Sequence, residues 1–270
     1  MIQDITKLKN EGKGYKFRNG PLFMGDILGF SNYVKTTPLG VVKQKMDNII
    51  YKIENINFID IIEEFKDRPE IKDKVINILS KEYRLNGHII SDTILIYPNK
   101  EIKEENSYLE LIIISSMLRV IFEFFLKENL LLRGTLNYGE YYISSSKSKS
   151  LYGKNMIEAH EYEQIQDWGG ILLSPKVVKK IYLIERESIV QYDVSFIKKE
   201  DRDEFVRQYK SNEPYVLAWP SIVKEFNWIS LYYDALKIEK EKIRESAIRK
   251  INNTIRFYQW YNEYQKKIKS

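Results

Sequence analysis

The chain has no cysteine and only two histidines, His88 and His160, among its 270 residues. Without cysteine, disulfides and thiolate metal sites are excluded. Two histidines are too few for a zinc site of three or more imidazoles within one chain. Any metal site therefore rests mainly on oxygen ligands, which favours Mg²⁺ or Mn²⁺.

From the sequence we expect neither a signal peptide nor a membrane span. Its N-terminus has neither a basic segment nor an apolar core, and the most apolar run, 109–126, contains Glu110, Arg119 and Glu123. The net charge of +5 is mild and dispersed along the chain, so it permits an anionic ligand without requiring nucleic acid. We expect a cytoplasmic protein that binds neither nucleic acid nor a membrane.

A single carboxylate, Asp26, interrupts the apolar stretch 22–31. The stretch is short and rich in Ile, Leu and Phe, which predicts a buried strand. A carboxylate in such a strand must be paired, protonated or bound to a metal. Gly29 then permits a tight turn, and Ser31 or Asn32 is placed to cap a following helix. The alternative is that Asp26 simply bonds nearby turn amides.

A second carboxylate, Asp92, interrupts the β-branched run 88–97, and Asn86-Gly87 before it is a turn signal. The alternative is that Asp92 is only a hairpin turn residue. Two carboxylates on adjacent strands of one sheet can hold two divalent cations a few ångströms apart.

Strand and helix patterns alternate irregularly along the chain, which predicts an α+β sandwich: a mixed sheet with helices on one or both faces. We expect an N-terminal arm at 1–20, one catalytic domain at 21–222 and a C-terminal helical extension at 223–270. The extension either joins two subunits or packs back on its own domain. Helices are predicted at 43–65 (one or two helices), 71–79, 107–128, 152–165 and 175–183, and strands at 131–144, 171–174, 189–197 and 215–219.

Three stretches together resemble the class III nucleotidyl cyclases, the adenylate and guanylate cyclase catalytic fold. Residues 26–31 (Asp-Ile-Leu-Gly-Phe-Ser) are similar to the metal motif Asp-x-x-Gly-Phe-Thr, and residues 90–94 stand at the place of the second metal aspartate on a β-hairpin. Residues 132–140 and 152–159 look like the family's Arg-x-Gly-x-x-x-Gly strand and the helix that follows it. The resemblance covers about residues 20–185 and implies a ferredoxin-like class III cyclase sandwich.

The resemblance implies a homodimer with its active sites at the interface. It implies that Asp26 and Asp92, with the carbonyl of Ile27, hold two Mg²⁺ or Mn²⁺ ions. The amides of Leu28, Gly29, Phe30 and Ser31 then hold phosphates. The implied reaction converts a nucleoside triphosphate into a 3′,5′-cyclic nucleotide and pyrophosphate.

The chain departs from the purine cyclases at two places. Ile157 and Glu161 occupy the helix positions of the transition-state Asn and Arg, and His88 stands where adenylate cyclases use a base-reading Lys. These departures resemble the bacterial antiphage Pycsar cyclases, which make cyclic UMP or cyclic CMP, so UTP or CTP is the leading substrate. Candidates for the base pocket are His88, Tyr138 and Tyr152, although each is equally readable as an ordinary strand or core residue.

The cation that replaces the missing Arg is open: Arg84, Lys154 and the lysines of the 144–150 segment are candidates. That Ser- and Lys-rich segment is either a solvated linker or a loop that folds over polyphosphate. Three alternatives to a pyrimidine cyclase are open: a purine (ATP or GTP) cyclase, a non-catalytic cyclase-like domain that binds nucleotide or a partner, and a nucleic-acid module on a ferredoxin-like sheet. Because positive and negative charges are interspersed along the chain, the nucleic-acid module is the least favoured of these alternatives.

Overall fold

The computed structural model describes residues 15–63, 65–80, 82–144, 150–181, 188–223 and 226–269. Its strands are β1 (Tyr15–Leu28), β2 (Leu85–Ile90), β3 (Thr93–Pro98), β4 (Leu131–Ser144), β5 (Leu151–Tyr152), β6 (Gly170–Leu173), β7 (Ile189–Gln191) and β8 (Tyr215–Leu217). Its α-helices are α2 (Phe30–Thr36), α3 (Leu39–Glu54), α4 (Phe58–Glu63), α5 (Pro69–Leu79), α6 (Ser107–Lys127), α7 (Lys154–Gln164), α8 (Pro175–Ile181), α9 (Arg202–Tyr209), α10 (Trp228–Leu236) and α11 (Glu241–Lys269).

The first half of the chain forms a ferredoxin-like unit. Its strands lie in the order β2-β3-β1-β4, each antiparallel to its neighbour, with α3 before the β2–β3 hairpin and α6 after it. This β-α-β-β-α-β order is the ferredoxin-like pattern. β6 then joins β4 in parallel, and β8 and β7 extend the sheet. The predicted α+β class with a mixed sheet and flanking helices is confirmed.

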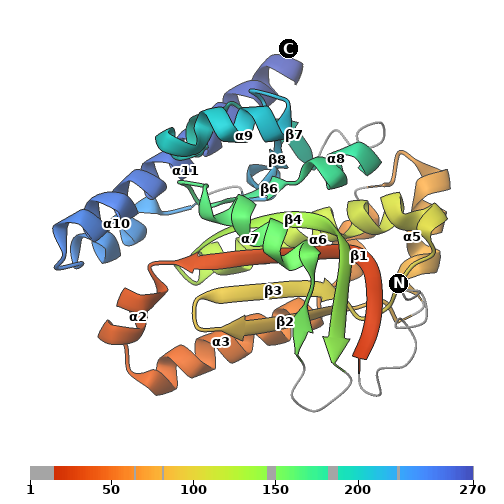
Figure 1. The fold of residues 1–270 in the computed structure, drawn as a ribbon, viewed down its shortest axis with the longest axis horizontal. Helices are drawn as coiled ribbons and strands as arrows, with labels where there is room; N and C mark the ends of the chain where they lie inside the picture. The colour runs from red at the N-terminus through yellow and green to blue at the C-terminus, as the bar shows by residue number, and fades with distance from the viewer. Residues whose placement is uncertain are drawn as a thin grey trace, which may run out of the picture.

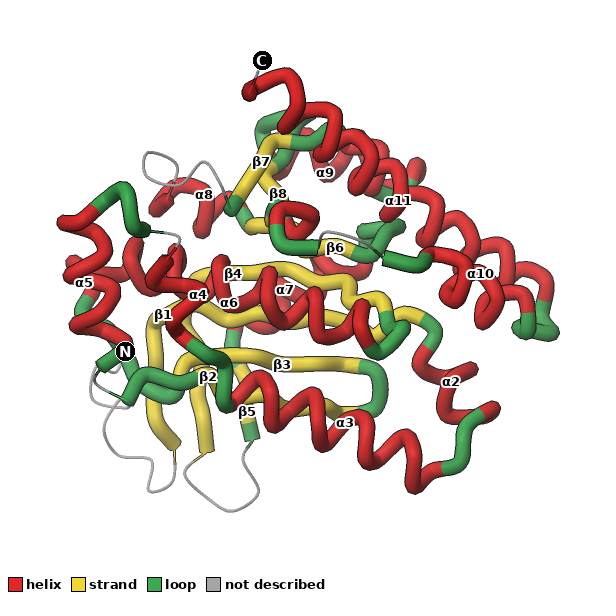
Figure 2. The backbone as a smooth tube through the Cα atoms, turned by 180° about the vertical axis from the view of Figure 1, so that it is seen from behind, coloured by secondary structure: helices red, strands yellow, loops and turns green. Residues whose placement is uncertain are grey.

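Helices cover the two faces of the sheet unequally. α3 and α6 lie on the face seen from behind, whereas α7 crosses β1 and β4 on the opposite face (Figures 1 and 2). Phe23 and Ile27 of β1 belong to the main core with α6, and Leu22 packs with Ala159 of α7 in a second, smaller cluster. Because side chains alternate along a strand, β1 contributes to both clusters.

The C-terminal helices pack back on their own chain. Phe257 and Tyr261 of α11 belong to the main core, and Phe257 makes an edge contact with Trp168 at 4.9 Å between ring centroids. Figure 1 shows α10 and α11 along one side of the sheet, beyond β6 and β8. The extension therefore packs back on its own domain, and its part in joining two subunits stays a prediction.

Several local predictions were wrong. Residues 15–20, expected in a loose arm, form the start of β1, where Tyr15 pairs with Ser144; residues 1–14 lie outside the described residues. The run 88–97 is not one strand but a hairpin, and Asn86-Gly87 lies inside β2. The strand expected at 189–197 ends at Gln191. In the runs 88–97 and 189–197, apolar residues lie on both sides of the turn. The pattern of apolar residues therefore did not show where each strand ends.

Candidate active site

Asp26 lies near the end of β1, the central strand of the ferredoxin-like unit, opposite Thr93 of β3 and Arg133 of β4. Its side chain retains 23% of its exposure, although its neighbours Gly25 and Ile27 are buried. The predicted buried strand with one carboxylate is therefore confirmed, and the carboxylate itself reaches solvent.

The backbone under Asp26 is formed by a pair of glycines. Gly25 lies directly opposite Gly134, and the ring of Phe23 lies against both. A Cβ on Gly134 would meet that ring at 2.4 Å, and a Cβ on Gly25 would meet the Arg133 carbonyl at 2.6 Å. Larger residues at these two positions would push β1 and β4 apart, so the glycines fix the position of Asp26 relative to Arg133.

The β2–β3 hairpin carries Asp92 in its two-residue turn, Ser91-Asp92, where Ser91 has a left-handed φ of 60°. The N–H of Ile27 donates to the carbonyl of Asp92 at 2.8 Å. This bond joins the turn to the residue after Asp26, so the two predicted metal-binding aspartates lie close together. Asp92 is thus both a turn residue and a neighbour of Asp26.

Arg133 pairs with Asp26 on one side and with Glu163 of α7 on the other. Its Nη2 lies 3.0 Å from Oδ2 of Asp26 and 2.5 Å from Oε1 of Glu163, and its Nη1 donates to the Gln166 carbonyl at 2.8 Å. Burial raises the pKa of Asp26, and the charge of Arg133 opposes that rise. Burial likewise raises the pKa of Glu163. Asp26 and Glu163 are two carboxyl groups that pair with a single arginine. A further positive charge would therefore be favourable beside them.

The donor set at Asp26 fits a divalent cation bound through oxygen. Among the described residues, Oδ1 of Asp26 accepts no hydrogen bond, and the negative charge of Asp92 acts on the same carboxyl. No group of three or more His, Asp or Glu side chains within the described ranges is arranged to hold a metal. The remaining ligands would therefore come from a carbonyl such as that of Ile27, from water and from substrate phosphate, as is usual for Mg²⁺.

The predicted phosphate-binding residues follow directly after Asp26. Leu28 ends β1, Gly29 turns the chain with φ 78°, and Phe30 and Ser31 begin α2. The first N–H groups of a helix have no partner inside the helix. The predicted cap was wrong: Gly29 is the N-cap residue, and neither Ser31 nor Asn32 caps the helix with its side chain. The turn itself agrees with the prediction.

The three base-pocket candidates do not come together within one chain. His88 lies on β2, and its Nε2 is 2.8 Å from the hydroxyl of Tyr97. Tyr138 lies opposite Pro21, five residues along β4 from Arg133, or about 17 Å at the usual strand rise. Tyr152 on β5 stacks on Tyr142, still further from Asp26.

The candidate cations Arg84 and Lys154 also lie away from Asp26. The Arg84 guanidinium lies 4.8 Å from the centre of the Phe58 ring, at the end of β2 remote from Asp92. Lys154 begins α7 after Gly153, which packs on Glu140 and Tyr141, toward the far end of β4. Lys147 and Lys149 lie outside the described residues.

Sequence reasoning missed three groups around Asp26: Glu163 at the end of α7, Asp167 before β6, and Lys250 on α11. The charge of Lys250 acts on both Asp26 and Asp167. No local motif marks these residues, since each comes from a different element.

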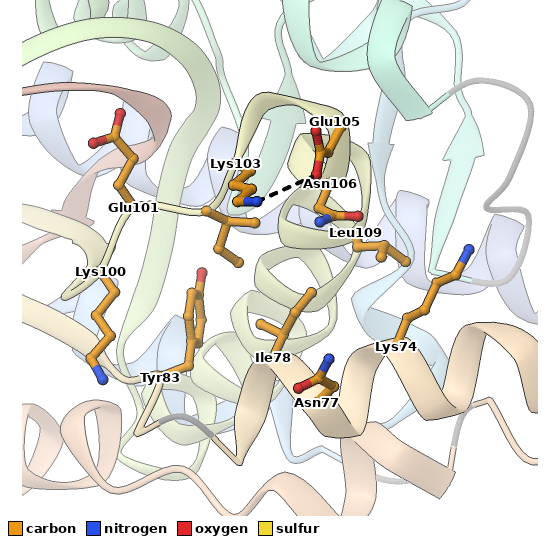
Figure 3. Close-up of a pocket in the computed structure, with 11 residues that line it drawn as sticks. Lys74, Asn77, Ile78, Tyr83, Lys100, Glu101, Lys103, Glu105, Asn106 and Leu109 are labelled. Atoms are coloured by element: carbon orange, nitrogen blue, oxygen red, sulfur yellow. Dashed lines mark ion pairs between the residues drawn. The ribbon is translucent and has the colours of Figure 1, made fainter.

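A cavity of about 330 Å³ lies elsewhere, between α5 and the segment that joins β3 to α6. Tyr83, Lys100 and Leu109 line it, and Figure 3 shows these side chains around an opening between α5 and α6. Lys100 follows the end of β3 remote from the Asp92 turn. This cavity is therefore separate from the Asp26 site.

No family model matches the chain, and no curated protein matches it. Among solved structures it is similar to the adenylyl cyclase CyaB from P. aeruginosa (14% identity, 76% of this chain and 95% of that chain, TM-score 0.44). It is also similar to the dimeric guanylyl cyclase domain of the RhoGC fusion protein from the aquatic fungus Blastocladiella emersonii (14%, 76% and 97%, TM-score 0.46). A third is the guanylate cyclase domain of RhGC from Catenaria anguillulae, in complex with GTP (14%, 75% and 98%, TM-score 0.45). At this level of identity and superposition, the similarities carry no argument about activity.

Proposed function

We propose that this chain is a metal-dependent nucleotidyl cyclase that converts a nucleoside triphosphate into a 3′,5′-cyclic nucleotide and pyrophosphate. The observation that carries the proposal is the convergence of Asp26 and Asp92 at one end of a ferredoxin-like sheet, joined by the bond from Ile27 N–H to the Asp92 carbonyl at 2.8 Å. The motif around each aspartate resembles that of class III cyclases, and the two lie together as that resemblance requires.

The residues around the pair have defined roles in this reaction. Arg133 donates to Oδ2 of Asp26 at 3.0 Å, which would leave Oδ1 for a cation. The turn at Gly29 places the start of α2 beside the carboxylates, where backbone N–H groups suit an anion. Divalent cations bound to the carboxylates would stabilise negative charge on the phosphates and polarise the attacking ribose hydroxyl. The 3′-oxygen would then attack the α-phosphorus, its proton would pass to solvent water, and the bond to the leaving pyrophosphate would break.

A homodimer completes the proposal. Ile90 at the hairpin is 67% exposed and Ile157 on α7 is 62% exposed, so each apolar side chain is free to contact a second copy. Within one chain, Tyr138 and Tyr152 lie far from Asp26. In the proposed homodimer, these two side chains would instead contribute to the active site of the second copy. Light scattering of the purified chain tests this: a monomer at all concentrations contradicts it.

We extend the proposal to UTP or CTP as substrate, with the cyclic product serving as a signal in antiphage defence. The support is the resemblance of the altered helix and base positions to the Pycsar cyclases. His88 is bonded to Tyr97 and stacked on it at 5.6 Å between ring centroids, which fills space beside β2. A smaller pocket favours a pyrimidine over a purine ring.

Four separate incubations with ATP, GTP, CTP and UTP, in Mn²⁺ or Mg²⁺, test the activity by mass spectrometry of the products. A cyclic nucleotide that disappears in Asp92→Asn supports the proposal. A cyclic purine keeps the cyclase and removes the pyrimidine assignment. No product from any nucleotide, with a folded dimer in hand, contradicts the enzyme.

The second candidate is a nucleotide-binding domain without turnover. One observation favours it: Ile157, at the position of a catalytic Asn, is an exposed apolar side chain with no hydrogen-bonding capacity. Calorimetry separates the two, because this candidate predicts metal-dependent binding of a triphosphate that is recovered unchanged.

A further inference from the structure

α11 is tied to the segment that leads into β6 by polar contacts. Arg249 forms an ion pair with Asp167, Nδ2 of Asn253 donates to the Asp167 carbonyl at 2.8 Å, and Gly169 N–H donates to the Thr254 hydroxyl at 2.6 Å. Thr254 and Asp167 are buried. Because Asp167 and Thr254 are buried, these bonds hold this part of α11 against the sheet.

The same segment lies next to the candidate active site. Gly170 pairs with Arg133 across β6 and β4, and Arg133 pairs with Asp26 across β4 and β1. Arg133 also binds the Gln166 carbonyl at 2.8 Å. The docked part of α11 therefore lies at the end of the sheet that holds Asp26.

Lys250 is on the docked face of α11. It precedes Thr254 by one helical turn, so the two side chains share a face, and the Thr254 hydroxyl donates to the Lys250 carbonyl at 2.7 Å. Lys250 is half-buried. The charged groups that act on it are Asp26 and Asp167, which are acidic, and Arg133 and Lys198, which are basic. Burial lowers the pKa of Lys250, and the two acidic groups oppose that change.

Lys250 has a free charge, whereas Arg133 does not. The guanidinium of Arg133 is shared among Asp26, Glu163 and the Gln166 carbonyl. Lys250 makes no ion pair or side-chain hydrogen bond within the described part of the chain. An ammonium held half-buried within electrostatic reach of two carboxylates, without an ion pair in the described part of the chain, is suited to an anion that arrives with metal.

We propose that Lys250 binds the triphosphate of the substrate, so that the C-terminal helix supplies the cation that α7 lacks. This inference rests on the proposed function. Ile157 and Glu161 on α7 carry no positive charge, and Arg84 and Lys154 lie far from Asp26 in the same chain. The C-terminal extension is accordingly part of the active site.

An ammonium at this position has two opposite effects on binding. It attracts the triphosphate, and it repels a divalent cation that binds to Asp26 and Asp92 without nucleotide. Lys250→Met should therefore weaken binding of inorganic triphosphate about tenfold in saturating Mn²⁺. The same variant should bind Mn²⁺ alone several-fold more tightly. A role confined to packing α11 would change neither affinity in this paired way.

The experiment measures both affinities on the full chain: Mn²⁺ alone by electron paramagnetic resonance, and inorganic triphosphate by calorimetry in saturating Mn²⁺. Inorganic triphosphate is common to all nucleoside triphosphates, so the test is independent of the base. Lys250→Arg keeps the charge and should retain triphosphate binding. Lys266→Met is the matched control, since Lys266 is exposed on the same helix about 24 Å further along.

The outcomes separate this inference from the proposed function. If the unmodified chain binds neither Mn²⁺ nor triphosphate, the proposed function fails and this inference fails with it. If the unmodified chain binds both, and Lys250→Met behaves like Lys266→Met, only the role of Lys250 is overturned. Weaker triphosphate binding together with tighter Mn²⁺ binding in Lys250→Met alone supports it.

Discussion

β1 carries a buried cluster of acid and arginine near each end, and the two clusters differ in what they leave unbound. Near its C-terminal end, Arg133 binds the carboxylates of Asp26 and Glu163. Near its N-terminal end, Arg18 donates to the carbonyls of Pro98 at 2.6 Å and Asn99 at 2.5 Å, and its charge acts on Glu110.

The carboxyls of the two clusters have different access to solvent. Glu110 is 2% exposed, and burial raises its pKa to about 8, so it is largely protonated at neutral pH. Asp26 keeps 23% of its side-chain exposure and lies beside a second carboxylate, Asp92. The comparison teaches that a buried acid beside an arginine is not by itself a site. Solvent access and a neighbouring second carboxylate distinguish the candidate functional cluster from the structural one.

The largest expected effect is on activity at the Asp26 end. Asp26→Asn should lower the rate of cyclic nucleotide formation about a thousandfold, because a neutral amide binds a divalent cation poorly. Glu110→Gln is the same chemical change in the other cluster and should leave the rate within about twofold. Mass spectrometry of the product measures both. Equal losses of activity in the two variants would show that the two clusters do not differ in function.

The next effect is on stability at the Arg18 end. Arg18→Met should lower the free energy of unfolding by about 3–5 kcal/mol, because the buried Pro98 carbonyl and the half-buried Asn99 carbonyl both lose their donor. Urea unfolding measures the change. Arg207→Met is the control, since Arg207 pairs with Glu204 on the surface and should have little effect. An Arg18 variant as stable as the control contradicts a structural role for this cluster.

The third effect is a pH dependence of stability that originates at Glu110. The folded chain binds this proton more tightly than the unfolded chain, since the pKa rises from 4.5 to about 8 on folding. The stabilising contribution is complete below pH 4.5 and is lost as the pH rises through about 8. Glu110→Gln should remove this part of the slope, so that its melting temperature falls less than that of the unmodified chain between about pH 5 and 8, the window of that loss. If the melting temperatures of the variant and the unmodified chain change equally with pH, Glu110 is already ionised in the folded chain.

The smallest effect is at the docking of α11, a feature of the Asp26 end alone. Thr254→Val keeps the side-chain shape but leaves Gly169 N–H without its acceptor, and should cost about 1–3 kcal/mol of stability. Thr254→Ser keeps the hydroxyl and should cost less. If both variants match the unmodified chain in thermal unfolding, the bond does not hold α11 in place.

Much of the Asp26 strand could be predicted because its signals are local. The apolar run, the carboxylate within it and Gly29 after it all lie within ten consecutive residues, 22–31. The mixed α+β class was also readable, since helical and strand periods alternate along the chain.

The hairpin and the arginine cluster were not readable in the same way. Both strands of the hairpin are apolar, so their periodicity shows no break in the run 88–97. A turn at Asp92 was one of two alternatives, and the pairing of β2 with β3 decides for it. Arg133 and Glu163 belong to separate elements, and their contact depends on how α7 crosses β4. No spacing in the sequence encodes that crossing.

By itself the sequence determined many of the segments that form strands and helices, and that an oxygen-based cation site was the metal chemistry open to this chain. Local apolar periodicity and residue chemistry are sufficient for both. Only the tertiary structure decided which charges surround Asp26. Arg133, Glu163 and Lys250 come from three elements, and the register of β4 on β1 and the docking of α11 bring them to one place. Such neighbours are set by packing across the whole chain, which no local pattern contains.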